Sequence, residues 1–231
     1  RIENQVFIKP PLAKLVLSTS SNFNKPFALN LTGSLSHRLG HNYSIWKDFS
    51  NIHTYFRINP RFRINNHTFL EYITAIEQKY NQFGWIAEDN EWGTIFSRRT
   101  RNTLTNKLAL NYTFNAKSYI KLIARHYWST INNHSFYELN QNGGLINSTY
   151  NNNHEVNFNT WNLDVNFSWE YSPGSFLSVV WQNELTHQNS EVEKIFFNNI
   201  NEFFENPSTN IFSIKFTYYL DYLNLVANKK Q

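Results

Sequence analysis

Histidine, carboxylate and hydroxyl side chains occur in combinations that hydrolases use. His126, Asp164 and Ser168 are of the types that serve as base, orienting acid and nucleophile, but they are dispersed among repetitive polar segments. Glu170 and Glu184 flank a Pro-Gly turn, and two neighbouring carboxylates can share acid–base work. The sequence contains no Gly-x-Ser-x-Gly, no His-Glu-x-x-His and no Gly-rich phosphate loop. We favour a polar interior in which acids meet bases, and we predict that the chain is not an enzyme.

Side chains that bind metals are equally sparse. His37 and His41 are four residues apart, a spacing that places two imidazoles on one face of a helix. Here they fall at a strand end and in a loop, with no Glu between them. The chain has no Cys, which excludes thiolate zinc sites, disulfides and cysteine nucleophiles. We interpret both histidines as solvated and expect no metal and no cofactor.

The composition is unusual for a globular domain. The 231 residues are enough for one large domain, and 20 Phe, 13 Tyr and 7 Trp carry much of the apolar content. The net charge is +4, and Lys and Arg are scattered apart from a local concentration at Arg98, Arg99 and Arg101. Nucleic-acid binders usually concentrate basic residues on one face, so we expect no nucleic-acid partner. No apolar run approaches the roughly 20 residues of a membrane-spanning helix.

Apolar and polar residues alternate with a period of two, which predicts β-strands. From Trp161 to Tyr171 every odd position is aromatic or aliphatic and every even position is polar. The same alternation recurs over residues 56–64, 104–114 and 210–222, with Asn106 as the exception in the second of these stretches. We expect about nine strands, which cover residues 8–19, 27–37, 52–64, 68–80, 94–114, 118–129, 157–171, 176–186 and 210–222.

Three features favour an antiparallel transmembrane β-barrel of the outer-membrane type over a soluble sandwich. The strands run about 10–13 residues, long enough to cross a bilayer at a tilt of about 45°. The apolar face carries aromatic rings at its ends, as the interfacial girdles of membrane barrels do. Short connections such as 115–118 and 172–175 alternate with long ones, 81–93, 130–156 and 187–209, as periplasmic turns alternate with extracellular loops.

Strand number and direction predict that this chain supplies only part of a barrel. Bacterial single-chain barrels have even strand numbers, and an edge open to lipid leaves backbone groups without partners. With about nine strands, the first and the last run in the same direction and should not pair. We expect missing strands from upstream residues or from a second chain. Residues 1–231 would then be one C-terminal barrel domain, with any N-terminal module absent.

The alternation also divides the candidate functional side chains between two faces. Charged residues expected to face the lumen, where they would set pore selectivity, are Arg57, Arg61, Arg63, Lys107, Lys121, Arg125, Asp164, Glu170, Glu184 and Lys215. Residues expected in the aromatic girdle are Trp128, Trp161, Trp169, Tyr171, Trp181, Tyr218 and Tyr222. A mixed-charge lumen is equally compatible with a salt-bridged, closed interior. The local excess of arginine near residues 57–63 would favour anions.

The last long connection is rich in phenylalanine. Phe196, Phe197, Phe203 and Phe204 lie among Asn and Glu residues. An exposed aromatic patch of this kind often marks a partner site, here for another protein of the cell envelope. We favour the alternative, in which the loop folds back onto the mouth of the barrel.

Two stretches resemble a known family. One runs from Phe158 to Gln182 and contains Trp-Glu-Tyr-Ser-Pro-Gly-Ser at residues 169–175, and the other runs from Asn206 to Lys215. They are similar to the C-terminal barrel of a Bacteroidota family of unknown function, domain family 5916, over about residues 50–223. The resemblance implies a carbohydrate-binding-like module ahead of a large barrel. It implies no catalytic residue, because the family has no agreed activity.

We therefore expect an outer-membrane β-barrel of a Gram-negative bacterium, with its C-terminus in the periplasm. Its partners would be outer-membrane lipid and lipopolysaccharide, and its role that of a non-enzymatic channel, transporter or structural barrel. Two alternatives stay open. One is a soluble β-rich carbohydrate-binding module whose aromatic and Asn side chains contact sugars. The other is an outer-membrane hydrolase that works at the barrel rim through His126 or Ser168.

Overall fold

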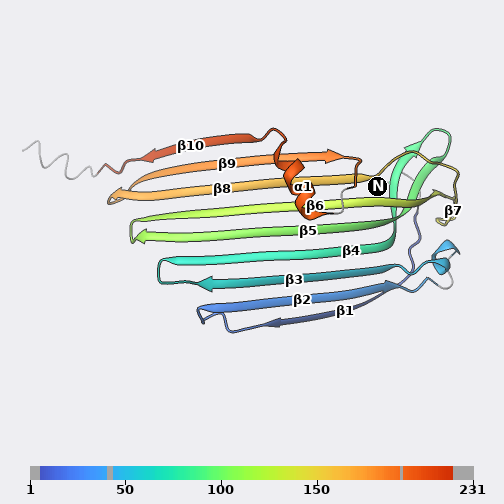
Figure 1. The fold of residues 1–231 in the computed structure, drawn as a ribbon, viewed down its shortest axis with the longest axis horizontal. Helices are drawn as coiled ribbons and strands as arrows, with labels where there is room; N and C mark the ends of the chain where they lie inside the picture. The colour runs from blue at the N-terminus through green and yellow to red at the C-terminus, as the bar shows by residue number, and fades with distance from the viewer. Residues whose placement is uncertain (1–5, 41–43, 193–194, 221–231) are drawn as a thin grey trace, which may run out of the picture.

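The computed structural model describes residues 6–40, 44–192 and 195–220, and these form an antiparallel sheet of ten strands. Figure 1 shows the long strands side by side across the molecule. The strands are β1 (Leu12–Ser20), β2 (Phe27–Arg38), β3 (Ile52–Arg63), β4 (Thr68–Asp89), β5 (Gly93–Asn115), β6 (Ser118–Leu139), β7 (Leu145–Asn147), β8 (Val156–Ser172), β9 (Ser175–Asn189) and β10 (Thr209–Thr217). The 3-10 helix η1 (Ser44–Asp48) precedes β3, and the α-helix α1 (Phe196–Phe204) precedes β10.

Each long strand pairs with its neighbours in the sequence. The order is β1-β2-β3-β4-β5-β6-β8-β9-β10, and the short strand β7 also pairs with β6. The predicted all-β antiparallel architecture is confirmed, and every predicted strand overlaps an observed one. Within the described residues, β1 pairs only with β2 and β10 only with β9. The sheet is therefore open, and the prediction that its first and last strands do not pair is confirmed.

Two strands extend well beyond the alternation that predicted them. β4 continues to Asp89 and β6 to Leu139, through residues that were expected to be loop. The pairing of β4 with β5 shifts register between Lys79 and Gln82, and Asn81 between them has a φ of 52°. An extra residue in a bulge moves the following side chains to the other face. A period-two pattern cannot be followed across such a point, which is why the extensions were not predicted.

The extended strands build a small hydrophobic core at the end of the sheet where the long connections lie. Trp46 of η1, Phe83 of β4, Phe96 of β5, Tyr137 of β6 and Leu145 of β7 are all buried there. The rings of Trp46 and Phe83 are 4.4 Å apart, and those of Phe83 and Tyr137 are 5.3 Å apart. In Figure 1 these strand ends curve away from the main sheet, with β7 and η1 beside them. This end of the protein therefore has an interior of its own.

Tight turns join the strands at the opposite end of the sheet. β8 and β9 are connected through Pro173 and Gly174, and Gly174 has a φ of +73°, which glycine adopts without a steric penalty. β5 and β6 are connected through residues 116–117. Short connections at one end and longer ones at the other follow the prediction, with one difference. The connection 90–92 at the far end is short, because β4 and β5 themselves extend.

The connection between β9 and β10 contains a helix that the sequence analysis did not predict. Residues 187–209 were expected to be loop, whereas β9 continues to Asn189 and α1 spans Phe196–Phe204. A helix this short has only about two turns over which a 3.6-residue period can appear. Phe196, Asn199 and Phe203 nevertheless recur at helical spacing and face the sheet. No helix in the described part of the chain is long and apolar enough to cross a membrane.

Candidate functional site

The strand register assigns the side chains of the main sheet to two faces. Directly paired residues lie on the same face, and successive residues lie on opposite faces. We define the aromatic face as the one that carries Val165 of β8, together with its partners Leu122 of β6 and Trp181 of β9. The charged face is the one that carries Asp164 and Glu170.

Charge is confined to one of these faces. In β1, β2, β3, β8, β9 and β10, and over residues 68–79, 101–115 and 118–132, every Asp, Glu, Lys and Arg lies on the charged face. All the charged residues predicted to line a lumen are on that face: Arg57, Arg61, Arg63, Lys107, Lys121, Arg125, Asp164, Glu170, Glu184 and Lys215. The same stretches present only uncharged residues and histidine on the aromatic face.

One centre of charge on this face is Glu71 of β4. Arg61 of β3 donates through Nε to Glu71 Oε1 at 2.7 Å, and Lys107 Nζ of β5 lies 3.6 Å from Oε2. Asn59 Nδ2 donates to Oε1 at 3.3 Å. Three adjacent strands therefore converge on one carboxylate, which pairs with two cations at once.

A second centre lies three strands away, at Asp164 of β8. Arg125 Nη1 of β6 donates to Asp164 Oδ2 at 2.6 Å, and Gln182 Nε2 of β9 donates to Oδ1 at 2.9 Å. A third acid, Glu77 of β4, lies 2.8 Å from His53 Nε2 of β3. In each case the partners come from neighbouring strands, so that side-chain bonds cross the sheet alongside the backbone ladder.

The other predicted lumen residues are not drawn into these centres. Glu170 Oε1 accepts a hydrogen bond from the backbone N–H of Gly174 at 3.0 Å. The predicted residues that form no ion pair with any described residue are Arg57, Arg63, Lys121, Glu170, Glu184 and Lys215. Four of these six are basic. The charged face therefore combines neutralised pairs with an excess of free positive charge.

The charged face is the more enclosed of the two. Small residues in the middle of its strands are buried, such as Asn59 at 3% exposed and Ala75 at 7%. Large apolar residues on the aromatic face of interior strands are open, with Phe56 at 48% and Ile76 at 57% exposed. A water-soluble sheet normally buries its large apolar face against a second layer. Here most of that face has no such layer in the described structure.

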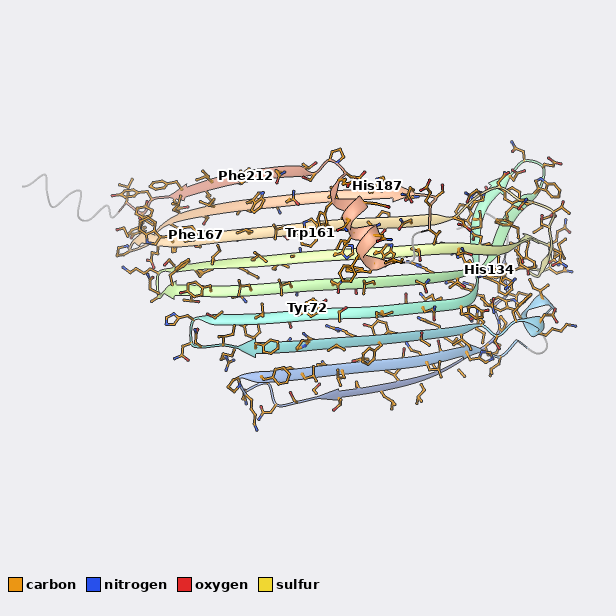
Figure 2. All side chains as sticks on the ribbon, viewed as in Figure 1. Tyr72, His134, Trp161, Phe167, His187 and Phe212 are labelled. Carbon is orange, nitrogen blue, oxygen red and sulfur yellow. The ribbon has the colours of Figure 1, made fainter. Side chains whose placement is uncertain are left out.

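Aromatic rings lie toward both ends of the apolar band. Trp169 and Tyr171 lie near the tight turns, where Tyr171 stacks on Phe216 with ring centres 5.0 Å apart. Trp161 and Trp128 lie toward the other end, opposite His126 and Asn159 respectively. Figure 2 shows Phe167 near the tight turns and Trp161 further along the same strand, beside α1.

The remaining girdle residues have different positions. Trp181 lies within the band, paired with Val165 and stacked on Phe212 with ring centres 5.8 Å apart. Tyr218 follows β10 and is exposed. Tyr222 lies outside the described residues. The aromatic side chains expected at the ends of the apolar band are therefore not all at its ends, since Trp181 lies within the band.

Two neighbouring rows of paired residues differ in chemistry on the aromatic face of β3, β4, β5 and β6. The last apolar row across these four strands consists of Phe56, Ile76, Leu104 and Trp128. The next row on the same face is entirely hydroxyl and amide: Thr54, Gln78, Asn102 and Thr130. The row on the other side of Phe56 is mixed, with Ile58 beside Thr74, Asn106 and His126. In β2, Leu35 is paired with Thr54, so the boundary between the apolar row and the polar row is confined to these four strands.

Helix α1 lies on the aromatic face at this boundary. Asn199 of α1 and Asn159 of β8 are both almost fully buried and exchange two side-chain hydrogen bonds, of 2.9 and 3.0 Å. The ring of Phe196 lies 6.1 Å from that of Trp128. Phe197 points away and is 73% exposed. The connection was expected to fold onto the mouth of a barrel. Its helix instead packs on the aromatic face, on the side of the sheet opposite the charged face.

The phenylalanines at the end of the helix divide in the same way. Phe203 is buried, with its ring 6.1 Å from that of His126. Phe204 contacts Trp161 at 5.4 Å between ring centres and stays half-exposed. Within the predicted aromatic patch, Phe196 and Phe203 therefore fix the helix to the sheet, whereas the exposed rings are available for outside contacts.

The candidate catalytic residues are not brought together. His126 lies on the aromatic face beneath α1, whereas Asp164 and Ser168 lie on the charged face. Neither ring nitrogen of His126 has a hydrogen-bond partner among the described residues. A base must reach the proton that it abstracts, and these side chains are separated by the sheet itself. These three side chains therefore do not form a catalytic group together.

Glu170 and Glu184 are also far apart, which corrects the expectation that they lie near each other. Glu184 pairs with Asn162, eight residues along β8 from Glu170. At about 3.3 Å per residue this separation is roughly 26 Å. No group of three or more metal-binding side chains is present in the described part of the chain, and His41 lies outside it.

Sequence reasoning missed a groove on the aromatic face. The groove has a volume of about 570 Å³. It extends from the boundary toward the end of the sheet with the long connections, and its lining residues include Gln78, Asn102, Trp128, Asn132 and His134. Gln78 Nε2 donates to Asn102 Oδ1 at 3.0 Å. The signal was a series of amide and hydroxyl residues at aromatic-face positions in four neighbouring strands. It becomes visible only when the register is known.

His134 lies at the far side of this groove. Its Nε2 lies 2.8 Å from Thr100 Oγ1. Partial burial and the nearby positive charge of Arg98 lower the pKa of His134, while Glu155 opposes the shift. Figure 2 places His134 close to the end where the extended strands curve away.

These features define an all-β protein whose open sheet, over the described residues, carries charged side chains on one face and apolar side chains on the other. Residues 1–229 match the family described as "Domain of unknown function (DUF5916)", and the chain belongs to that family. The expected family is thus confirmed, over more of the chain than the predicted residues 50–223. Comparisons with the curated proteins and with the solved structures found no match.

Proposed function

We propose that the chain forms part of the wall of a β-barrel in the outer membrane of a Gram-negative bacterium. The observation that carries the proposal is the confinement of charge to one face of the sheet. In a barrel wall the aromatic face would contact lipid and the charged face would contact a polar lumen. A soluble sheet of this kind would leave an aromatic surface far larger than monomers usually expose.

The height of the apolar band supports this proposal. In β8 the aromatic-face residues from Trp161 to Tyr171 are without exception apolar or aromatic. This stretch is about 11 residues long, which at about 3.3 Å per residue and a tilt of about 45° spans roughly 25 Å. That is the height of the apolar band of outer-membrane barrels. The tight turns would then face the periplasm and the small hydrophobic core would face outward.

The two edges of the sheet bear on how a barrel would be completed. β1 and β10 each have one edge without a strand partner in the described structure. Each unpaired backbone group in lipid costs several kcal/mol. We propose that additional antiparallel strands, from further residues of the same polypeptide or from another chain, pair with these edges.

The charged face supports a non-enzymatic role in transport or in the structure of the envelope. Pairs such as Arg61–Glu71 and Arg125–Asp164 neutralise part of the lumen and brace neighbouring strands. The unpaired Arg57, Arg63 and Lys121 leave a positive balance, which in an open pore would favour anions. The long-connection end is positioned for contacts with other proteins of the envelope.

The proposal is tested by extraction and spectroscopy of the protein produced with an export signal. It should be found in the outer-membrane fraction, require detergent for extraction and give a β-rich circular dichroism spectrum. A monodisperse, detergent-free monomer with the same spectrum would refute the membrane assignment.

A further inference from the structure

The groove on the aromatic face has a lining suited to sugars. Among the described residues, none that line it is Asp, Glu, Lys or Arg. Gln78, Asn102 and Asn132 offer amides, and Thr100 and Thr130 offer hydroxyls, groups that both donate and accept hydrogen bonds. Sugar hydroxyls also do both. A phosphate or a metal ion would find no counter-charge here, and an unpaired charge is costly to desolvate.

An aromatic platform lies at the edge of this polar surface. Trp128 lines the groove, and its Nε1 donates to Asn157 Oδ1 at 2.8 Å, which fixes the indole plane. The face of an aromatic ring carries a partial negative charge. It attracts the weakly positive hydrogens of the C–H bonds on the flat side of a pyranose. Ile76 and Leu104 extend the apolar surface beside Trp128.

The groove lies across the boundary between apolar and polar chemistry. Ile76 and Leu104 belong to the last apolar row, whereas Gln78 and Asn102 belong to the first polar row. In the proposed membrane orientation this level coincides with the headgroups of the outer leaflet. A lipid that carries sugar would have its chains below the row and its saccharide in the groove.

The connection between β9 and β10 also contributes to the lining of the groove. Among the described residues this contribution is Val192, whereas the other lining residues belong to β3, β4, β5 and β6. Phe196 of α1 lies beside Trp128, with ring centres 6.1 Å apart. The groove is therefore built mainly by the strands of the sheet.

We propose that this groove binds uncharged sugar residues in the headgroup of a glycolipid of the outer leaflet. The assignment of a glycolipid rests on the proposed function, because it depends on the aromatic face being in contact with the membrane. The saccharide chemistry itself rests on the neutral lining and on Trp128.

The experiment measures binding of rough lipopolysaccharide to the protein in phosphatidylethanolamine nanodiscs by native mass spectrometry. The test variant is the double substitution Gln78→Leu and Asn102→Leu, which removes two amides from the groove. The matched control is Asn166→Leu, an exposed asparagine on the charged face. Loss of about two hydrogen bonds should weaken binding about tenfold in the test variant and leave the control unchanged. Equal binding by all three proteins would overturn the proposal.

A second arm uses the core oligosaccharide released from the same lipopolysaccharide by mild acid. It should bind more weakly than the intact glycolipid, because it lacks the chains that concentrate the headgroup at the membrane, and it should show the same loss in the double variant. Binding of the free oligosaccharide alone, without binding of the glycolipid, would overturn the glycolipid assignment.

This arm also separates the two proposals. If the protein proves soluble without detergent but its oligosaccharide binding is lost in the double variant, the membrane function fails and the sugar site stands. If the protein is membrane-embedded and neither probe binds above the phosphatidylethanolamine background, the sugar site fails and the membrane function stands.

Discussion

At the scale of single residues, the face on which a side chain lies decides what it tolerates. Val165 and Asn166 are neighbours in β8 and lie on opposite faces, Val165 opposite Trp181 and Asn166 opposite Lys121. The period-two pattern predicted that these two side chains lie on opposite faces, and the strand register places them so. What the pattern could not supply was the partner of each residue, since pairing depends on the neighbouring strand.

The first prediction compares these two positions. Val165→Arg should lower the free energy of unfolding in lipid vesicles by about 2–4 kcal/mol, because it places a charge in the apolar band. Asn166→Arg should cost far less, because its side chain would remain among water and other charged groups. Denaturant titration followed by tryptophan fluorescence measures both. Equal costs would show that the faces are assigned wrongly.

The second prediction concerns the carboxylate shared by Arg61 and Lys107. Glu71→Gln leaves both cations without their acid, so the free energy of unfolding should fall by about 1–3 kcal/mol. Glu184→Gln is the matched control, since no described residue forms an ion pair with Glu184, and it should change stability by less than about 0.5 kcal/mol. Denaturant titration in the same vesicles measures the free energy of unfolding of both variants. If Glu184→Gln lowers it as much as Glu71→Gln does, the ion pairs of Glu71 do not contribute to stability.

At the scale of elements, strand positions could be predicted where alternation is unbroken and not where a bulge intervenes. The strand ends near Arg63 and Asn115 were expected to within a residue. The bulge at Asn81 moves the side chains that follow Lys79 to the opposite face of the sheet. The alternation therefore stops at this point and does not predict the continuation of β4. The small hydrophobic core that depends on this continuation was missed for the same reason.

Helix α1 illustrates a different limit. Its aromatic residues were identified as a patch, but two turns of helix are held mainly by tertiary packing rather than by intrinsic propensity. The contact that fixes it is the buried pair Asn159 and Asn199, and their separation of 40 residues leaves no local trace in the sequence. The groove was missed for a related reason, because most of its lining residues come from different strands and meet only in the paired sheet.

The third prediction tests this docking. Asn199→Ala removes both hydrogen bonds to Asn159 and leaves that buried amide with only its hydrogen bond to Asn157, at 3.4 Å, which should weaken docking by about 1–3 kcal/mol. Hydrogen exchange at residues 196–204 should become faster, with little change in β8 and β9. Asn198→Ala, at an exposed position of the same helix, is the matched control. Unchanged exchange in Asn199→Ala would mean that the ring contacts alone hold the helix.

At the scale of the whole molecule, the all-β class and the separation into two faces were predictable, since both follow from alternation over long strands. The open form of the sheet was predictable too, from the parallel directions of its first and last strands. The distribution of ion pairs was not, because Glu71 and Asp164 find their partners across neighbouring strands. The charged face is therefore best understood as a network of the assembled sheet rather than as a property of any segment.

The ladder in which each long strand pairs only with its sequence neighbours also sets how the sheet can form. Every backbone pairing closes a hairpin, except where β7 intervenes between β6 and β8, and closing short loops costs little chain entropy. Folding dominated by such local contacts is comparatively fast, so the sheet can grow one hairpin at a time. The unpaired edges of β1 and β10 would be the last to find partners. Until each edge is paired, a strand of another unfolded molecule can pair with its free backbone groups. Aggregation during assembly should therefore begin at these two edges.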